Sequence, residues 1–384
     1  MKRLEIQELP EKFFPNLETD DNDMNESIFM SSETMKNFGI KKGDMIKIKT
    51  DEINKFIDMK ALEISGEEVC KDVGYITKHV YVRVAGNSIS RNKIDVITLG
   101  CDPEFFLFSS QGSEDFGRIM AYKRKHSICG RDIGLDGAGY IGEFRPPPAE
   151  NELELTNNIS KLINQTKYML NEAQKEDILR QDSRWTLKAL SYYGKHNGRP
   201  AGFHVHLGLP PAVLRSKVAL SNLVSVLDYF VGIPCLGIDR EYLRRIYREG
   251  FRHSGYYGKP MNYKWGSVTL EYRFPGGYHL RHPDLTRGLI GMSHMVAEDF
   301  LARTKVVGTF EVKPKLIYRT PPIDSIKEAT LSVKDPRLDG WIQDISTKVE
   351  KMITYQKHKS SVEAFLTIAR EEKEVNPDIL QNWR

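Results

Sequence analysis

The pattern of apolar and polar positions divides the chain into two parts. Up to about residue 95, short β-rich runs such as SIFMSS, DMIKIKT and YVRV are separated by turn sequences. Beyond that point, longer strand-like and helix-like stretches alternate without a regular βαβ period. We therefore expect a small β-rich domain over residues 1–95 and a larger α+β body after it.

Four stretches of the second part have the apolar alternation of strands, namely residues 96–108, 139–147, 201–209 and 267–275. Helical periodicity predicts helices over 150–177, 211–230 and 283–304. Two further charged helices are expected near 340–355 and 360–373, in a peripheral position. We divide this part into a catalytic domain over 96–310 and a C-terminal helical extension over 311–384 that packs on it.

Each predicted strand has one apolar face and one face with a pair of ionisable side chains. Residues i and i+2 of a strand share a face, which pairs Asp102 with Glu104, Glu143 with Arg145, His204 with His206, and Glu271 with Arg273. A half-exposed antiparallel sheet that simply meets water would explain any one of these strands. The scarcity of lysine, serine and threonine on these faces favours a site instead.

If the four strands share a sheet, one wall collects five metal-ligating side chains: Asp102, Glu104, Glu143, His204 and Glu271. So many acids would repel one another and raise one another's pKa unless cations lay among them. Carboxylates with one imidazole suit Mg²⁺ or Mn²⁺ better than Zn²⁺. Nearby arginines indicate an anionic substrate, most simply phosphate groups.

Composition and charge exclude several classes of protein. Apolar residues make up 40% and charged residues 28%, as in an ordinary globular chain, and the net charge of +4 does not indicate nucleic acid. We expect no membrane span and no signal peptide, and the four scattered cysteines predict a cytoplasmic protein. Without GxGxxG or GxxxxGK[ST], a Rossmann or P-loop site is not expected.

A basic, glycine-rich segment precedes the Glu271 strand. It contains Arg252, Lys259 and Lys264, and Arg248 lies just before it on a predicted helix. The segment is either a surface loop with a basic helix face or a flap that binds an anion over the site.

These motifs resemble a known family. GCDPEFFLF is similar to the first metal-binding strand of glutamine synthetases, and GFHVHLGL to their Gly-x-His-x-His strand. TLEYRFPGG resembles the Glu-x-Arg strand of glutamine synthetases and glutamate–cysteine ligases, and DGAGYIGEFRPPP the Asp-Gly…Glu-Phe-x-x-Pro signature of amidoligases. All four occur in the family's order over about 100–285 and are most similar to the phage-type carboxylate–amine ligases, type 2. Separately, ETMKNFGIKKGDMIKI resembles part of small β-barrels.

The resemblance implies a glutamine-synthetase-like catalytic domain with a curved antiparallel sheet backed by helices. It also implies roles for individual residues. Glu104, Asp136 and Glu143 would hold one Mg²⁺ or Mn²⁺ ion, and Asp102, His204 and Glu271 a second that bridges the ATP phosphates. His206 would contact a nucleotide phosphate and Arg273 the transferred γ-phosphoryl group. Arg248, Arg252, Lys259 and Lys264 would add positive charge around nucleotide and acyl phosphate. Asp102 departs from the glutamate of glutamine synthetases and reaches less far.

The function expected from the resemblance is ATP-dependent ligation of a carboxylate to an amine through an acyl phosphate, with Glu143 as a candidate base. Substrates would be small-molecule or peptide carboxylates and amines, and relatives make rings and dimers, so a homo-oligomer is open. A phage-encoded chain would act in the host cytoplasm. Two alternatives remain: an inactive scaffold or binding protein that keeps the ligase fold, and a metal-dependent hydrolase that needs no ATP.

Overall fold

A computed structural model of the protein divides the chain into two compact units, Met1–Asp95 and Val96–Arg384. In the second unit it describes residues 97–128, 130–136, 140–194, 199–239, 258–266, 268–307, 311–314, 320–332, 335–371 and 374–383. In the first unit it describes the backbone of five strands. Each unit is considered by itself.

The five strands of the first unit form one mixed sheet in the order β1-β5-β2-β4-β3. They are β1 (Glu5–Glu8), β2 (Ser27–Met30), β3 (Met45–Lys49), β4 (Phe56–Glu63) and β5 (Val73–Ile76). The predicted runs SIFMSS and DMIKIKT contain β2 and β3, whereas YVRV lies outside the described residues. A barrel-like form for this unit stays a prediction.

The second unit is built around an antiparallel sheet with the strand order β14-β15-β13-β6-β9-β8. Its strands are β14 (Tyr263–Trp265), β15 (Thr269–Tyr272), β13 (Phe203–Gly208), β6 (Leu99–Ser109), β9 (Gly142–Phe144) and β8 (Ile133–Leu135). Two further strands, β7 (Gly112–Glu114) and β10 (Thr186–Lys188), also pair with β6. Small hairpins join β11 (Tyr192–Tyr193) to β12 (Arg199–Pro200), and β16 (Thr304–Val307) to β17 (Glu311–Pro314). The predicted α+β class with an antiparallel sheet is confirmed.

Helices make up much of the rest of this unit. They are α4 (Gly117–Lys125), α5 (Glu152–Lys175), α6 (Pro211–Leu214), α7 (Lys217–Leu227), α8 (Ile233–Ile238), α10 (Pro283–Arg303), α11 (Ile323–Leu331), α12 (Arg337–Val349), α13 (Tyr355–Glu371) and α14 (Ile379–Asn382). A π-helical turn, Asp228–Gly232, joins α7 to α8, and a 3-10 helix, Gly277–Leu280, precedes α10.

Local capping explains where two of these helices begin. The side chain of Asn151 accepts a hydrogen bond from the backbone N–H of Glu154 and starts α5. Ser216 accepts from the N–H of Ala219, so the helix expected over 211–230 is split into α6 and α7.

Among the described residues one stretch, Lys217–Ile238, is long and apolar enough to cross a membrane, but 78% of it is buried within the protein. Core helices of that kind pass the same test.

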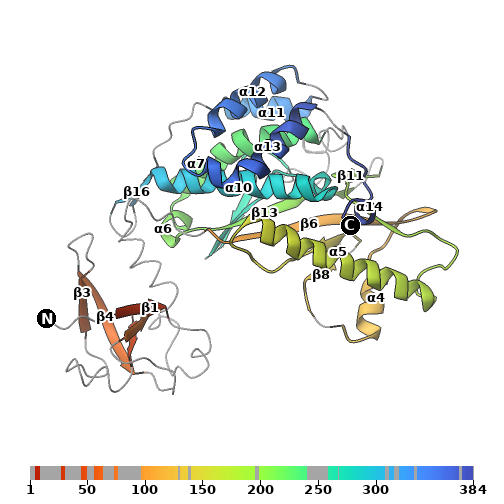
Figure 1. The fold of residues 1–384 in the computed structure, drawn as a ribbon, viewed down its shortest axis with the longest axis horizontal. Coiled ribbons are helices and arrows are strands. Elements are labelled where there is room, and N and C mark those ends of the chain that lie inside the picture. The colour runs from red at the N-terminus through yellow and green to blue at the C-terminus, as the bar shows by residue number, and fades with distance from the viewer. Residues whose placement is uncertain are drawn as a thin grey trace. The chain divides into compact units, whose positions relative to one another are not determined.

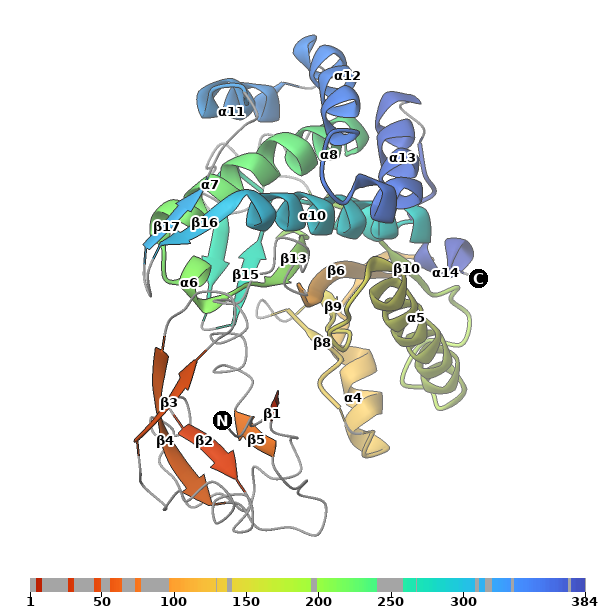
Figure 2. The same cartoon turned by 60° about the vertical axis from the view of Figure 1, so that its left-hand side comes forward.

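The helices cover the apolar face of the sheet. Phe105, Leu207 and Leu270 point to this face and are fully buried. Figures 1 and 2 show α7, α10 and α13 stacked over one side of the strands, with α10 running across them. Helix α13 buries Phe365 against this layer, so it is part of the core and not the peripheral helix expected from its charge.

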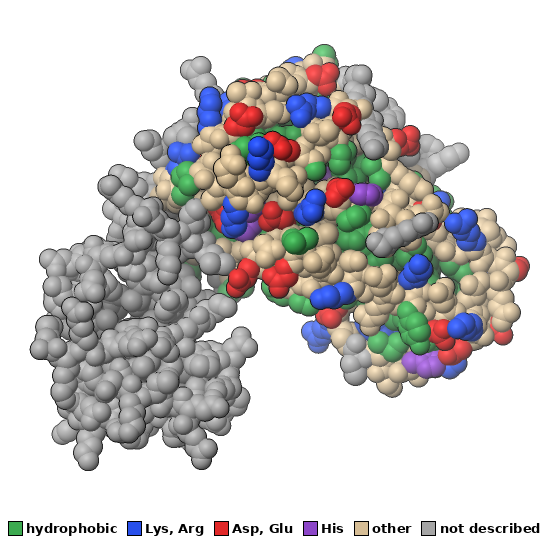
Figure 3. Space-filling model, viewed as in Figure 1, with side chains coloured by type: hydrophobic (Ala, Val, Ile, Leu, Met, Phe, Trp, Pro, Cys, Tyr) green, Lys and Arg blue, Asp and Glu red, His purple; other side chains and the backbone are tan. Residues whose placement is uncertain are grey.

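The surface of the second unit carries both signs of charge. On the face drawn in Figure 3, basic and acidic side chains are interspersed over the described part of the chain. On this face the two kinds of charged side chain alternate.

Candidate active site

The strand register brings the predicted ionisable side chains onto one face of the sheet. His204 lies directly opposite Asp102 on β6, and His206 lies opposite Glu271 on β15. On the other side of β6, Glu104 lies opposite Glu143 of β9. Because side chains alternate along a strand, these six residues share the face opposite Phe105 and Val205. The wall expected from the sequence is therefore present in the geometry, whereas the role of each residue in it is a separate question.

Three carboxylates gather at one end of this wall. Oxygens of Glu104, Asp136 and Glu143 all lie within 4.8 Å of one another. Glu104 is 1% exposed and Glu143 is 7% exposed, so little water separates their charges. A guanidinium group reaches in, since Arg145 Nη2 pairs with Glu143 Oε2 and donates a hydrogen bond to the backbone carbonyl of Leu135. A buried carboxylate triad of this kind has the donor set of a hard divalent cation.

Glu104 is fixed from the side of the neighbouring strand. The backbone N–H of Gly202 donates to Glu104 Oε2 at 2.7 Å, and the Glu104 N–H donates to the Gly202 carbonyl at 2.9 Å. A Cβ atom at position 202 would fall 2.5 Å from His204 Nε2, so glycine is required for the imidazole to lie here. The glycine before the histidine strand thus orders two site residues at once.

His204 lies between the two groups of acids. Its Nε2 is 3.9 Å from Glu104 Oε1, and its Nδ1 is 3.5 Å from Glu271 Oε1. The imidazole is 4% exposed and is surrounded by acceptor groups on both sides. It connects the carboxylate triad to the β15 end of the wall.

Asp102 contacts the second histidine of the strand. His206 Nε2 is 2.9 Å from Asp102 Oδ2. Burial lowers the pKa of His206, but the close contact with Asp102 and the charges of Asp102 and Glu271 outweigh burial and raise that pKa above its usual value. Asp102, His204 and Glu271 are not among the described groups whose ligand atoms all lie within 4.8 Å. In this conformation the second predicted ligand set is therefore less closely gathered than the first.

Basic groups flank Glu271. Arg273 is 9% exposed, and its Nε lies 3.1 Å from Glu271 Oε1. Lys264 of β14 is the cross-strand partner of Glu271, on a strand that was not expected from the sequence. Lys259 lies at the start of the segment that leads into β14. Arg248 and Arg252 lie outside the described residues.

A buried acid behind the sheet anchors this segment. Asp228 is fully buried, and its carboxyl accepts hydrogen bonds from the Met261 N–H at 2.6 Å and the Tyr272 hydroxyl at 3.0 Å. Burial raises the pKa of Asp228 to about 8. Asp228 therefore fixes both β15 and the turn before β14 from the face opposite Glu271.

A pocket continues along the face that bears the carboxylate triad. Phe106 and Phe108 follow Glu104 at intervals of two, and they form a small apolar cluster with Ile141 and Ala201. Beside this cluster is a pocket of about 470 Å³, lined by Phe106, Ser113, Glu114, Asp115, Arg118, Tyr140, Ile141, Tyr193, Gly194 and Arg199. The Arg199 guanidinium lies 3.8 Å from the centre of the Tyr140 ring. The pocket has the size and mixed polarity of a small-molecule site.

The sequence interpretation did not find this pocket. Its lining comes from five separate segments, of which β6 and Tyr140–Ile141 belong to recognised motifs. One signal was readable, because the face that carries Asp102 and Glu104 becomes aromatic at Phe106 and Phe108. The change from acidic to aromatic side chains along this face marks the boundary between the ionisable wall and the pocket.

Comparison with known proteins identifies relatives of the second unit. Residues 99–384 match the profile of a family described as phage phiEco32-like COOH.NH2 ligase, type 2. The match includes every predicted site residue and extends through the C-terminal helices. Among curated protein sequences, none matches this chain.

Several solved structures are distantly similar. The ligase PafA, solved in complex with the prokaryotic ubiquitin-like protein Pup, aligns at a TM-score of 0.46 and 12% identity over 72% of this chain and 64% of that one. Apo GmaS aligns at a TM-score of 0.42 and 13% identity over 78% and 77% of the two chains. A bifunctional glutathione synthetase from Pasteurella multocida aligns at 0.39 and 10% over 72% and 48%. This chain thus spans less than two thirds of the Pup ligase, and likenesses at this level carry no assignment of substrate.

Proposed function

The chain belongs to the family of phage phiEco32-like carboxylate–amine ligases of type 2, and we propose that it forms an amide or isopeptide bond with ATP as the phosphoryl donor. The family makes it a C–N bond-forming ligase, as the motifs predicted. ATP, an acyl-phosphate intermediate and two Mg²⁺ or Mn²⁺ ions are the further content of the proposal, together with a glutamine-synthetase-like catalytic domain. The convergence of Glu104, Asp136 and Glu143 beside His204 and Glu271 is the observation that carries it.

The reaction needs two steps because a carboxylate is a poor electrophile. Its leaving group in a direct attack would be oxide. Transfer of the γ-phosphoryl group of ATP to a carboxylate oxygen makes an acyl phosphate and ADP, and phosphate can then leave. Attack by a neutral amine on the acyl carbon forms the C–N bond, expels phosphate and releases the second proton of the ammonium group.

The side chains of the wall fit two divalent ions. Glu104, Asp136 and Glu143 would hold one ion, since their oxygens already lie within 4.8 Å of one another. Asp102, His204 and Glu271 would hold the other after a shift of Asp102 away from His206, which it contacts at 2.9 Å. When bound, such ions neutralise the charge that spreads over the phosphoryl oxygens.

The protein's own cations would orient the phosphates. Arg273 is held by Glu271 with its guanidinium in the wall, where it would contact the transferred phosphoryl group. His206 would donate to a nucleotide phosphate, whose negative charge would favour the protonated, donating form of the ring in place of the charge of Asp102. Lys264, opposite Glu271, and Lys259 would add positive charge at the β14 edge. Arg248 and Arg252 keep the roles that the family resemblance implies.

The pocket beside the triad would take the acid or the amine. It lies on the same face as Glu143, which would accept the proton of the incoming ammonium group while Arg145 holds the carboxylate in place. Arg118 and Arg199 can pair with an acidic substrate group, and Glu114 and Asp115 with an amino group. A substrate that carries both charges, such as an amino acid or a peptide end, matches this lining.

The proposal is tested by incubating the full chain with ATP, Mg²⁺ or Mn²⁺ and a panel of carboxylates and amines. The expected result is ADP together with a product lighter than its two precursors by one water. Hydroxylamine in place of the amine should trap the acyl phosphate as a hydroxamate. ATP-independent turnover would favour the hydrolase alternative, and ATP binding without ADP formation for any substrate pair would favour the scaffold.

A further inference from the structure

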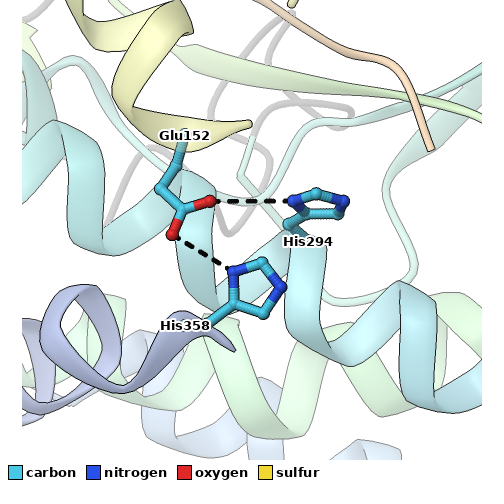
Figure 4. Close-up of side chains that lie close together, drawn as sticks. All are labelled: Glu152, His294 and His358. Atoms are coloured by element: carbon cyan, nitrogen blue, oxygen red, sulfur yellow. Dashed lines mark hydrogen bonds and ion pairs between the residues drawn. The ribbon is translucent and has the colours of Figure 1, made fainter. Parts of the chain in front are cut away.

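A second group of ionisable side chains lies among the helices, outside the catalytic wall. Glu152 is the first residue of α5, His294 lies in the middle of α10, and His358 lies in the first turn of α13. The two histidines are 1% exposed, and Glu152 is 8% exposed. Figure 4 shows both imidazole rings turned towards the one carboxylate. Helices from three distant parts of the sequence therefore meet at this point.

Both histidines present the same ring atom to Glu152. His358 Nδ1 lies 3.1 Å from Glu152 Oε1, and His294 Nδ1 lies 3.7 Å from Glu152 Oε2. One ligand atom from each of the three residues falls within 4.8 Å of the others. The hydroxyl of Ser361, one turn further along α13, donates to Glu152 Oε1 at 3.1 Å and is a fourth polar group at the same place.

The opposite ring atoms of both histidines face a different carboxylate. His358 Nε2 is 2.9 Å and His294 Nε2 is 3.2 Å from the oxygens of Glu298. Lys357 Nζ holds Glu298 at 2.6 Å. Histidines that bind a metal through one nitrogen commonly donate the other N–H to a carboxylate, which fixes the tautomer and the ring orientation. Glu298 is placed to do this for both rings.

The backbone of α10 makes room for this arrangement. A Cβ atom at Gly291 would lie 2.8 Å from Ser361 Cβ and 3.3 Å from Glu152 Oε1. One turn earlier, a Cβ atom at Gly288 would lie 2.6 Å from Phe365 Cβ. These two glycines allow α13 and the start of α5 to approach α10 closely enough for the three ligands to meet.

We propose that Glu152, His294 and His358 bind one divalent transition-metal ion, Zn²⁺ before others, which fastens α5 and α13 to α10. Two imidazoles and a carboxylate suit Zn²⁺, and because the three ligands are buried between helices we assign the ion a structural role. On binding, the ion would replace any proton on the coordinating nitrogens of the two histidines, and Glu152 would remain a carboxylate ligand. Both imidazoles would then be neutral. Glu298 and Lys357 would form the shell behind the ligands.

A metal-free ring of hydrogen bonds explains the geometry less well. Among the described residues, neither ring nitrogen of His294 makes a hydrogen bond of acceptable geometry, although each faces a carboxylate. If both histidines were protonated instead, two cations would lie with ring centres 4.7 Å apart in the protein interior.

The first measurement is the metal content of the full chain after gel filtration in metal-free buffer. We expect about one zinc per chain, since a buried structural ion exchanges slowly, whereas ions of the open catalytic wall are lost. Cobalt added to chelator-treated protein should give the intense visible bands of a tetrahedral ion. The variant His358→Gln keeps an amide near Glu298 but lacks the Nδ1 ligand, and it should lose the zinc and the bands.

The control variant is Glu104→Gln, which alters the catalytic wall and should keep the full zinc content. This separation makes the inference independent of the proposed ligase reaction. If His358→Gln does not fold, the zinc content of the wild-type protein still tests the proposal. Less than about a tenth of an equivalent of zinc, with no rise in the unfolding midpoint when zinc is added, would mean that the cluster is an ion-pair network only and would overturn the proposal. Zinc lost from Glu104→Gln but kept by His358→Gln would also overturn it.

Discussion

The buried carboxyl of Asp228 gives the fold a stability that depends on pH. Its pKa in an unfolded chain is near 3.8, and burial raises the folded value to about 8. Between these values the folded state binds the extra proton, so stability is highest at low pH and falls as pH rises towards 8. The slope approaches about 1.4 kcal/mol per pH unit. From pH 6 to pH 9 the loss is about 3 kcal/mol.

The substitution Asp228→Asn imitates the protonated acid. The amide oxygen can accept from the Met261 N–H, and the amide nitrogen can donate to the Tyr272 hydroxyl, so both present contacts are kept. We expect the variant to lose this pH dependence and to become more stable than the wild type above pH 8. The difference in free energy between the two proteins should change by about 3 kcal/mol between pH 6 and pH 9.

Urea unfolding at several pH values measures this difference. All four tryptophans, Trp185, Trp265, Trp341 and Trp383, lie in the second unit, so their fluorescence reports on the unit that contains Asp228. Asp324→Asn is the matched control, since that side chain is 81% exposed. It should leave the pH dependence of the wild type unchanged. If the free energies of unfolding of the wild type and of Asp228→Asn changed with pH in parallel, Asp228 would have the same pKa in the folded and unfolded states, and the prediction would be wrong.

Three other predictions concern the site and the helices. Glu104→Gln should lower metal-dependent ADP formation by about 100-fold or more with an unchanged far-ultraviolet CD spectrum, whereas Glu328→Gln, with a side chain 67% exposed, should keep full activity. Arg199→Ala removes the cation over Tyr140 and should raise the KM of one substrate about tenfold with less effect on kcat; an unchanged KM for all three substrates would exclude the pocket. Gly291→Ala should destabilise the protein by about 1–3 kcal/mol in urea unfolding, because its Cβ would meet Ser361, while Gly340→Ala, whose Cβ meets open space, should not destabilise it.

Short-range patterns in the sequence were sufficient to predict which ionisable side chains share one face of the sheet. The i, i+2 spacing of Asp102 with Glu104 and of His204 with His206 fixes which side chains share a face, whatever the strand pairing. The pairing of those strands was not readable, and it decides the contacts. His204 is the cross-strand partner of Asp102, but the ring that contacts Asp102 is that of His206, whose Nε2 lies 2.9 Å from Asp102 Oδ2.

Strand and helix ends were also beyond the sequence patterns. The proline run at 146–148 begins one residue beyond β9, so that strand has only three residues and Arg145 lies past its end. The helix expected over 211–230 is divided by the Ser216 cap and then continues past residue 230 through a π-helical turn to Ile238. In that turn the side chain of Asp228 lies in the core. Helical periodicity in the sequence could not predict this, because an acidic residue on an otherwise apolar face looks like a break in the apolar pattern.

The two ionisable clusters differ in a way that explains why only one was predicted. On the sheet, ionisable side chains occur in pairs within single strands, so one member of a pair indicates the other two residues away. Among the helices, Glu152 and His358 are separated by 206 positions and belong to segments that read as ordinary amphipathic helices. A lone histidine on such a face carries no signal of a partner. Only the close approach of α10 and α13, which Gly288 and Gly291 allow, turns three isolated residues into one site. A zinc content that depends on His358 but not on Glu104 would thus show that the helical layer holds a metal centre independent of the catalytic wall.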